Sequence, residues 1–227
     1  MAGRLSAVLF DMDGTLLDSE KLWAVGLRDL CARLGFVMDE TLRASLIGMD
    51  HMQSMRRLHA MLGIGPDGVD DSADWLLKRM SELFSEGVVW QPGAQELVRQ
   101  VRDAGYATAL VTATKRVLVD VIVTTIDPGQ FDVSVCGDEV ERNKPDPMPY
   151  VHAMRLLDVP ASECIAIEDS RTGVDSAVAA GCSVLAVPSE VDIDAGDGVT
   201  VMSDLISVDV HALRAIHGRW HNTGRSI

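Results

Sequence analysis

Two pairs of carboxylate side chains stand at the ends of apolar runs. Asp11 and Asp13 come directly after the first run, and Glu168 and Asp169 stand at the end of a later one. Carboxylates that meet at one point stay ionised only when a cation neutralises them. The donors are oxygen atoms, with no His or Cys in either motif, and this donor set favours Mg²⁺. We therefore expect a magnesium site.

Two other segments offer a hydroxyl group, backbone amides and a fixed positive charge. Thr112 comes directly after an apolar run, and Lys144 precedes Pro145 and Pro147, which fix the local backbone. A phosphoryl group with three charged oxygens needs such groups around it during transfer. The chemistry expected from the four segments together is phosphoryl transfer from an ester.

The elements that must position these residues alternate between strand-like and helix-like patterns. Apolar runs of strand length predict strands over 5–10, 107–111, 132–136, 164–168 and 183–187. Helical patterns over 95–104, 148–157 and 173–180 precede or follow them. This order is typical of an α/β fold with a Rossmann-like, doubly wound parallel sheet. The ligand site of such a sheet lies outside the carboxyl ends of its strands, where the segments of Asp11, Thr112 and Glu168 stand.

The first strand is followed by a long segment of a different kind. Between residues 16 and 88 the sequence shows no strand-like run, and apolar residues recur at helical spacing. Helices are expected over 22–34, 40–46, 52–62 and 73–84. We predict a discontinuous α/β catalytic core made of residues 1–15 and 89–227, with an all-helical domain of residues 16–88 inserted into it.

Composition limits the classes of partner. The chain has 227 residues, 20 basic and 34 acidic side chains and a net charge of −14. This charge repels nucleic acids and anionic membrane surfaces, so neither is expected as a partner. No apolar stretch reaches the roughly 18–20 residues that cross a bilayer. The four cysteines are widely spaced and form no CxxC pair, which favours free thiols in a reducing cytoplasm. We expect a cytoplasmic monomer or weak dimer.

The four polar segments, taken in order, resemble the four motifs of the haloacid dehalogenase (HAD) superfamily. These motifs are Asp11-Met12-Asp13-Gly14-Thr15, Thr112, Lys144 and Glu168-Asp169. The opening from Asp13 to Glu20 further resembles the subgroup of sugar-phosphate phosphatases and β-phosphoglucomutases. That subgroup carries a helical cap at the place of the insertion. The resemblance covers nearly the whole chain.

The resemblance implies a catalytic role for each carboxylate. Asp11 would attack phosphorus and form an aspartyl-phosphate. Asp13 would protonate the leaving oxygen and later activate water. Mg²⁺ would be held by Asp11, by the backbone carbonyl of Asp13 and by Asp169. Glu168 would either join these ligands or orient its neighbours.

The resemblance also implies a set of groups that hold the substrate. Thr112, the backbone of Ala113 and Lys144 would bind the phosphoryl oxygens, and Lys144 would balance the charge of the nucleophile. Further substrate contacts are expected from Glu20, His51, Thr114 and Lys115. His51 has an equally good alternative as a packing residue of the helical domain.

Departures from the family patterns separate the possible reactions. Dehalogenases lack the second aspartate and the metal, and phosphonate hydrolases carry a small residue in place of the second aspartate. Asp13 and Asp169 therefore favour phosphate esters. In the mutases an arginine that follows a glycine grips a second phosphate, and His51 stands at the corresponding place here. An imidazole holds phosphate less well than a guanidinium. We predict a phosphatase of small phosphorylated metabolites, with a phosphohexomutase and a non-catalytic phospho-ligand-binding protein as alternatives.

Overall fold

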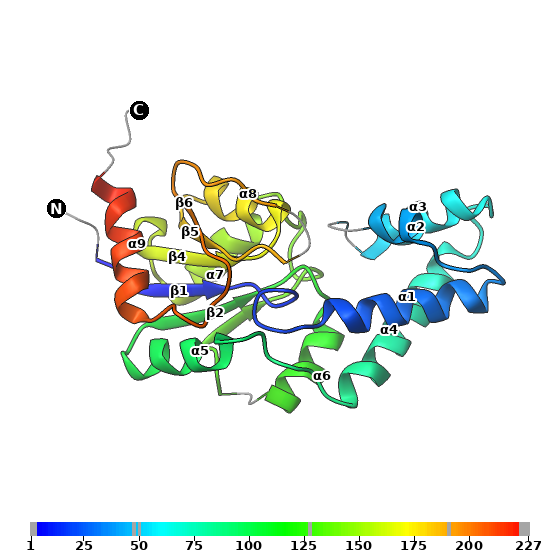
Figure 1. Cartoon of the computed structure of the whole chain (residues 1–227), viewed down its shortest axis with the longest axis horizontal. Coiled ribbons are helices and arrows are strands. Elements are labelled where there is room, and N and C mark those ends of the chain that lie inside the picture. Colours follow the sequence, from blue (N-terminus) through cyan, green and yellow to red (C-terminus); the bar gives the residue numbers. More distant parts are fainter. Residues whose placement is uncertain (1–3, 47–48, 50, 127–128, 190–191, 223–227) are drawn as a thin grey trace. The chain divides into compact units, whose positions relative to one another are not determined.

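The computed structural model of the chain describes residues 4–46, 49, 51–126, 129–189 and 192–222. Within these residues six strands form one parallel sheet in the order β3-β2-β1-β4-β5-β6 (Figure 1). The strands are β1 (Ala7–Phe10), β2 (Ala107–Val111), β3 (Val133–Val135), β4 (Cys164–Glu168), β5 (Ser183–Ala186) and β6 (Val199–Val201). The predicted α/β class with a doubly wound parallel sheet is confirmed.

Helices cover both faces of the sheet. One face carries α7 (Met148–Leu157) and α8 (Arg171–Ala179), and the other carries α5 (Ala94–Asp103) and α9 (Val210–Asn222) (Figure 1). Every residue of β1 is fully buried, as expected for a central strand covered on both sides. The small 3₁₀ helix η1 (Ala161–Glu163) leads directly into β4.

Strand alternation assigns side chains to one face or the other. Ala7 and Leu9 of β1 and Ala166 of β4 belong to the cluster that contains Tyr150 of α7 and Val174 of α8. Because side chains alternate along a strand, the next residues of the same parity, Asp11 and Glu168, are directed toward the α7 and α8 face.

Besides the short η1, three elements are not predicted from the sequence: α6 (Arg116–Ile126), β6 and α9. The α6 segment is rich in Val and Ile, which favour strands. Its buried residues Leu118, Val119 and Ile122 nevertheless recur at helical spacing, and this packing overrides the local preference. Strand β6 has three residues, too few to give a pattern.

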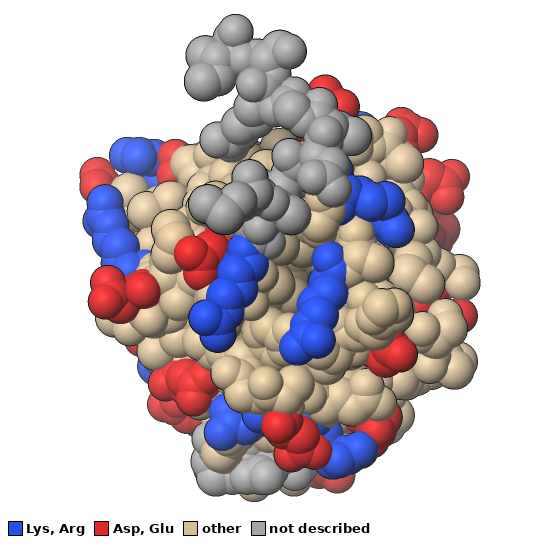
Figure 2. Space-filling model, turned by 90° about the vertical axis from the view of Figure 1, so that its left-hand side faces the viewer, with Lys and Arg blue, Asp and Glu red and all other residues tan. Residues whose placement is uncertain are grey.

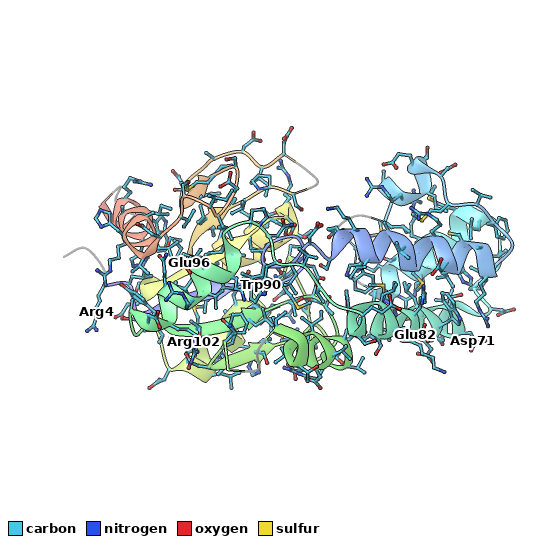
Figure 3. All side chains as sticks on the ribbon, turned by 60° about the horizontal axis from the view of Figure 1, so that its bottom comes forward. Arg4, Asp71, Glu82, Trp90, Glu96 and Arg102 are labelled. Atoms are coloured by element: carbon cyan, nitrogen blue, oxygen red, sulfur yellow. The ribbon has the colours of Figure 1, made fainter. Side chains whose placement is uncertain are left out.

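The described residues fall into two compact units. The larger contains residues of 1–18, 89–116 and 127–227, and the smaller contains residues of 19–88 and 117–126. The chain leaves and re-enters the larger unit along adjacent segments, because Leu17 forms a bridge with Trp90 and the Gln91 amide donates to the Leu16 carbonyl at 2.8 Å (Trp90 is labelled in Figure 3). The predicted division into residues 1–15 with 89–227 and residues 16–88 stays a prediction.

The secondary structure elements in the described part of residues 19–88 are all helices. They are α1 (Glu20–Arg33), α2 (Glu40–Ala44), α3 (His51–Leu62) and α4 (Val69–Ser85). Helix α4 packs against both α1 and α3. Gly26 allows α1 to approach α4 closely, because a Cβ there would lie 2.6 Å from Met80 Sδ. The acidic side chains of Asp71 and Glu82 lie along α4 (Figure 3).

Charged side chains are mixed on one face of the larger unit, and the cysteines are buried. On the face of the larger unit beside α9, acidic and basic side chains are interspersed, so the acidic excess forms no single patch there (Figure 2). The four cysteines are free and buried. Among the described residues, no helix is both long and apolar enough to cross a membrane.

Candidate active site

The carboxyl ends of β1, β2 and β4 converge on the ammonium group of Lys144. Its Nζ donates to Asp11 Oδ1 at 2.7 Å, to Glu168 Oε1 at 2.6 Å and to the Val111 carbonyl at 2.8 Å. These three acceptors come from three adjacent strands, whose register places Phe10 beside Leu110 and Ile167. The sheet therefore brings together three of the four sequence motifs within hydrogen-bond distance.

Burial makes this cluster electrostatically strong. The side chains of Lys144, Asp11 and Glu168 are 5%, 8% and 0% exposed. Burial, together with the negative charge of Glu168, raises the pKa of Asp11 to about 7, although Lys144 opposes the shift. Burial disfavours the charged form of Lys144, but Asp11 and Glu168 outweigh that cost and raise its pKa. The ammonium group of Lys144 therefore stays charged, and its positive charge stabilises the ionised carboxylate of Asp11.

Glu168 is held from several sides. Tyr150 Oη donates to Glu168 Oε1 at 2.6 Å, and burial followed by the charge of Glu168 raises the pKa of Tyr150 well above its usual value, so the phenol keeps its proton. A Cβ at Gly173 would overlap the Glu168 carboxyl group. Gly173 thereby leaves room for the carboxylate against the first turn of α8, which Ser170 caps by accepting from the Gly173 amide at 3.1 Å.

One carboxylate oxygen from each of Asp11, Glu168 and Asp169 lies within 4.8 Å of the other two. This buried, all-oxygen set fits a hard divalent cation such as Mg²⁺. Asp169 Oδ2 accepts a hydrogen bond from Ser189 and lies against Gly14, where a Cβ would overlap it. Gly14 has a φ of +81°, in the left-handed region that favours glycine. The turn after β1 therefore closes directly over the Asp169 carboxylate.

Asp13 contacts the segment that follows β2. Its Oδ2 accepts from Thr114 Oγ1 at 2.7 Å and from Thr112 Oγ1 at 3.3 Å. Thr112 Oγ1 in turn accepts from the Thr114 amide at 3.0 Å. The side chain of Asp13 thus contacts the second motif, at Thr112. The side chain of Asp11 contacts the third motif, at Lys144, and lies beside the carboxylates of the fourth.

The loop that carries Lys144 is tied to the same segment. Asn143 Nδ2 donates to the Ala113 carbonyl at 3.3 Å, and Asn143 Oδ1 accepts from the Lys144 amide at 2.8 Å. A Cβ at Gly137 would overlap the Ala113 carbonyl, so the backbone approaches closely here. Ala113 is itself exposed and offers its backbone at the surface.

The hydrogen bonds given above do not include Lys115, Glu20 or His51. Lys115 is half-buried and directly follows Thr114. Glu20 and His51 are the first residues of α1 and α3 in the smaller unit, where His51 Nε2 lies 3.0 Å from the Ala73 carbonyl oxygen. Their contacts with substrate stay predictions. Gly48 and Asp50, which precede His51 at the place where the mutases carry a glycine and an arginine, lie outside the described residues.

Sequence reasoning missed Tyr150, Ser189 and Gly173. Ser189 lies shortly after β5, so the rule that ligand sites follow strand ends could have selected it. Tyr150 and Gly173 lie within helices and carry no such signal. Their importance depends on which carboxylate they contact, and only the packing of α7 and α8 on the sheet determines that.

Most of the chain matches a known protein family. Residues 8–187 match the family described as Haloacid dehalogenase-like hydrolase. The chain is 34% identical over 196 residues to Protein CbbY of Rhodobacter capsulatus, covering 82% of this chain and 86% of that protein. It is 32% identical over 182 residues to the Phosphorylated carbohydrates phosphatase of Thermotoga maritima, covering 78% and 82%.

A solved structure of a similar protein has the same fold. The crystal structure of a CbbY mutant from Rhodobacter sphaeroides in complex with xylulose-(1,5)bisphosphate superimposes with a TM-score of 0.81 at 26% identity, covering 92% of this chain and 99% of that chain. The chain belongs to the haloacid dehalogenase-like hydrolases, and the family and enzyme class that its four motifs predict are confirmed.

Proposed function

We propose that the protein is a Mg²⁺-dependent phosphatase that hydrolyses small sugar phosphates through an aspartyl-phosphate. The observation that carries this proposal is the buried cluster in which Lys144 lies between Asp11 and Glu168, with Asp169 beside them. The names of two relatives support the substrate class, since one is a phosphatase of phosphorylated carbohydrates and another binds xylulose-(1,5)bisphosphate.

Asp11 is the proposed nucleophile. One of its oxygens is bound to Lys144, which holds the carboxylate in a single orientation and offsets its charge as the phosphoryl group approaches. Glu168 fixes Lys144 in turn, and Tyr150 fixes Glu168. We assign Glu168 to this positioning role because its Oε1 already accepts two short hydrogen bonds.

The proposed magnesium ligands are Asp11, Asp169 and the backbone carbonyl of Asp13. When bound, Mg²⁺ would neutralise the carboxylates and the phosphoryl oxygens. Ser189 orients Asp169 for this purpose. Thr112, the backbone of Ala113 and Lys144 would hold the phosphoryl oxygens.

Asp13 is the proposed general acid and base. In the first step a bond forms between Asp11 and phosphorus, the bond from phosphorus to the ester oxygen breaks, and that oxygen takes a proton from Asp13. In the second step Asp13 takes a proton from water, whose oxygen attacks phosphorus and releases Asp11. Inorganic phosphate leaves and Asp13 is protonated again.

Substrate specificity is assigned to the helical segment. We propose that residues 16–88 act as the cap of this family and that Glu20, His51 and Lys115 contact the part of the substrate beyond the phosphate. A cap that closes over the substrate would exclude water from the first step. The cytoplasmic location and the monomer or weak dimer stay predictions.

The test is a panel of sugar phosphates, including fructose 6-phosphate, glucose 6-phosphate and sorbitol 6-phosphate, assayed with Mg²⁺ and with EDTA. Release of inorganic phosphate that EDTA abolishes and Mg²⁺ restores is the expected result. Asp11→Asn is the matched control and should remove turnover while leaving the fold intact. Isomerised sugar phosphate in place of free phosphate would identify a mutase. Binding without any turnover would identify a phospho-ligand-binding protein.

A further inference from the structure

Two threonine hydroxyls converge on one oxygen of Asp13. Thr114 Oγ1 lies 2.7 Å from Asp13 Oδ2, and Thr112 Oγ1 lies 3.3 Å from the same oxygen. Thr114 is 8% exposed and Thr112 is 1% exposed, so water competes little for these hydrogen bonds. In this structure both hydroxyls donate to that oxygen.

The threonines are held in place independently of Asp13. The Thr114 amide donates to Thr112 Oγ1 at 3.0 Å, and the Thr112 amide donates to the Val135 carbonyl at 3.0 Å. The Gly137 amide donates to the Thr114 carbonyl at 3.0 Å. The segment after β2 is therefore anchored to β3 and to the loop that follows β3. It presents the Thr114 hydroxyl as a fixed donor.

We infer that Thr114 is a positioning residue for the general acid Asp13, and that it assists departure of the leaving group. This inference rests on the proposed function. It differs from the substrate contact that the family resemblance implies for Thr114, because the hydroxyl is directed to the Asp13 carboxylate.

The physical reason is the change of charge on Asp13 during the first step. Asp13 loses its proton to the ester oxygen and becomes a carboxylate. A hydrogen bond to a carboxylate is stronger than one to a neutral carboxylic acid. The Thr114 hydrogen bond therefore strengthens as the leaving oxygen takes the proton, and it stabilises the transition state more than the ground state.

This role predicts dependence on the leaving group. The oxygen of a sugar is a poor anion and needs the proton of Asp13 to leave. Nitrophenolate is a stable anion and leaves without it. Loss of the Thr114 hydroxyl should therefore slow hydrolysis of a sugar phosphate much more than hydrolysis of p-nitrophenyl phosphate.

The experiment compares kcat/KM for the best sugar phosphate of the panel with kcat/KM for p-nitrophenyl phosphate. For each ester, kcat/KM reports the steps up to the departure of the leaving group. It does not include hydrolysis of the aspartyl-phosphate, in which Asp13 also takes part. The variants are Thr114→Val, which keeps the shape and removes the hydroxyl, and Thr114→Ser, which keeps the hydroxyl.

For Thr114→Val we expect a loss of about tenfold with the sugar phosphate and of less than about threefold with p-nitrophenyl phosphate. Thr114→Ser should recover most of the loss. The matched control is Thr108→Val, at the start of β2, whose hydroxyl contacts Asp132 at 3.1 Å and not the site. It should leave the ratio of the two kcat/KM values unchanged.

An equal loss with both esters, or a loss confined to KM, would make Thr114 a phosphate-binding or structural residue and overturn the inference. If Thr114→Val fails to fold, Thr114→Ala is compared with Thr114→Ser in the same way. Wild-type protein that turns over neither ester would overturn the proposed function, and this inference with it. A wild-type enzyme whose Thr114 variants lose activity uniformly would overturn the inference alone.

Discussion

Tyr150 donates a 2.6 Å hydrogen bond to Glu168 through the same carboxylate oxygen that accepts from Lys144. The Lys144 Nζ also lies 5.2 Å from the centre of the Tyr150 ring. A residue of α7 thus fixes the position of the lysine that contacts the proposed nucleophile. A fully buried phenol is thus linked to the Asp11 carboxylate through Glu168 and Lys144.

Tyr150→Phe keeps the ring and removes this hydrogen bond. We expect kcat to fall about three- to tenfold and the free energy of unfolding to fall by about 1–2 kcal/mol, because a buried charged acceptor loses a donor. Steady-state assays and thermal denaturation measure the two effects. Tyr106→Phe is the matched control, since Tyr106 is the only other tyrosine and contacts Arg214 away from the site. An unchanged kcat in Tyr150→Phe would contradict the positioning role.

Gly173→Ala tests the space beside Glu168. Within a helix, alanine is more favourable than glycine by about 1 kcal/mol, so helix propensity alone predicts a gain in stability. The added Cβ would overlap the Glu168 carboxyl group, however, and we expect a net loss of about 1–3 kcal/mol with at least a tenfold lower kcat.

The matched control for Gly173→Ala is Gly218→Ala in α9. A Cβ at Gly218 meets no atom within 4 Å, so this variant should show the gain in stability and normal activity. Chemical denaturation and the phosphatase assay read out both variants. Equal stability changes in the two variants would show that the contact with Glu168 carries no energy.

Ser189→Ala tests the orientation of Asp169. Ser189 donates to Asp169 Oδ2, and loss of such a partner weakens metal binding by about tenfold or more. Titration calorimetry with Mg²⁺ should show this weaker affinity, while kcat at saturating Mg²⁺ stays within about twofold of the wild-type value. Ser203→Ala is the control, because Ser203 contacts the exposed Asp204. An unchanged affinity in Ser189→Ala would exclude this role.

The pKa of about 7 for Asp11 predicts competition between protons and Mg²⁺. Mg²⁺ binds the ionised carboxylate, so its affinity should fall by up to about tenfold for each pH unit below 7 and level off above it. Calorimetry between about pH 5.5 and about pH 8.5 measures this dependence. Asp11→Asn should remove it, and a slope that persists in Asp11→Asn would assign the proton to another group.

The raised pKa of Asp11 also predicts how the free energy of unfolding changes with pH. The pKa of Asp11 rises from 3.8 to about 7 on folding, so the metal-free folded protein holds a proton that the unfolded chain has lost. Through Asp11 alone, the free energy of unfolding should therefore fall as the pH rises from about 4 to about 7. This contribution is fully present below the unfolded-state pKa.

The fold class, most strands and the identity of the motif residues could be predicted from the amino-acid sequence. Buried strands of a parallel sheet appear as short apolar runs, and the motifs of Asp11, Thr112 and Glu168 stand at the ends of such runs. The rule that strand ends meet at one edge predicts that these three come together. Lys144 lies in a loop, and the family resemblance placed it in the site, where its 2.6–2.7 Å contacts with Glu168 and Asp11 lie. Helix α6 was missed because its Val and Ile residues favour strands locally.

How the motif residues are held depends on tertiary packing. Tyr150 and Gly173 contact Glu168, and Ser189 contacts Asp169, and such contacts join residues that are far apart or on different elements. The direction of the Thr114 hydroxyl was equally undetermined by the sequence, because a threonine can donate to substrate, backbone or a neighbouring carboxylate. The packing of the segment after β2 against β3 and against the turn after β1 selects the carboxylate of Asp13.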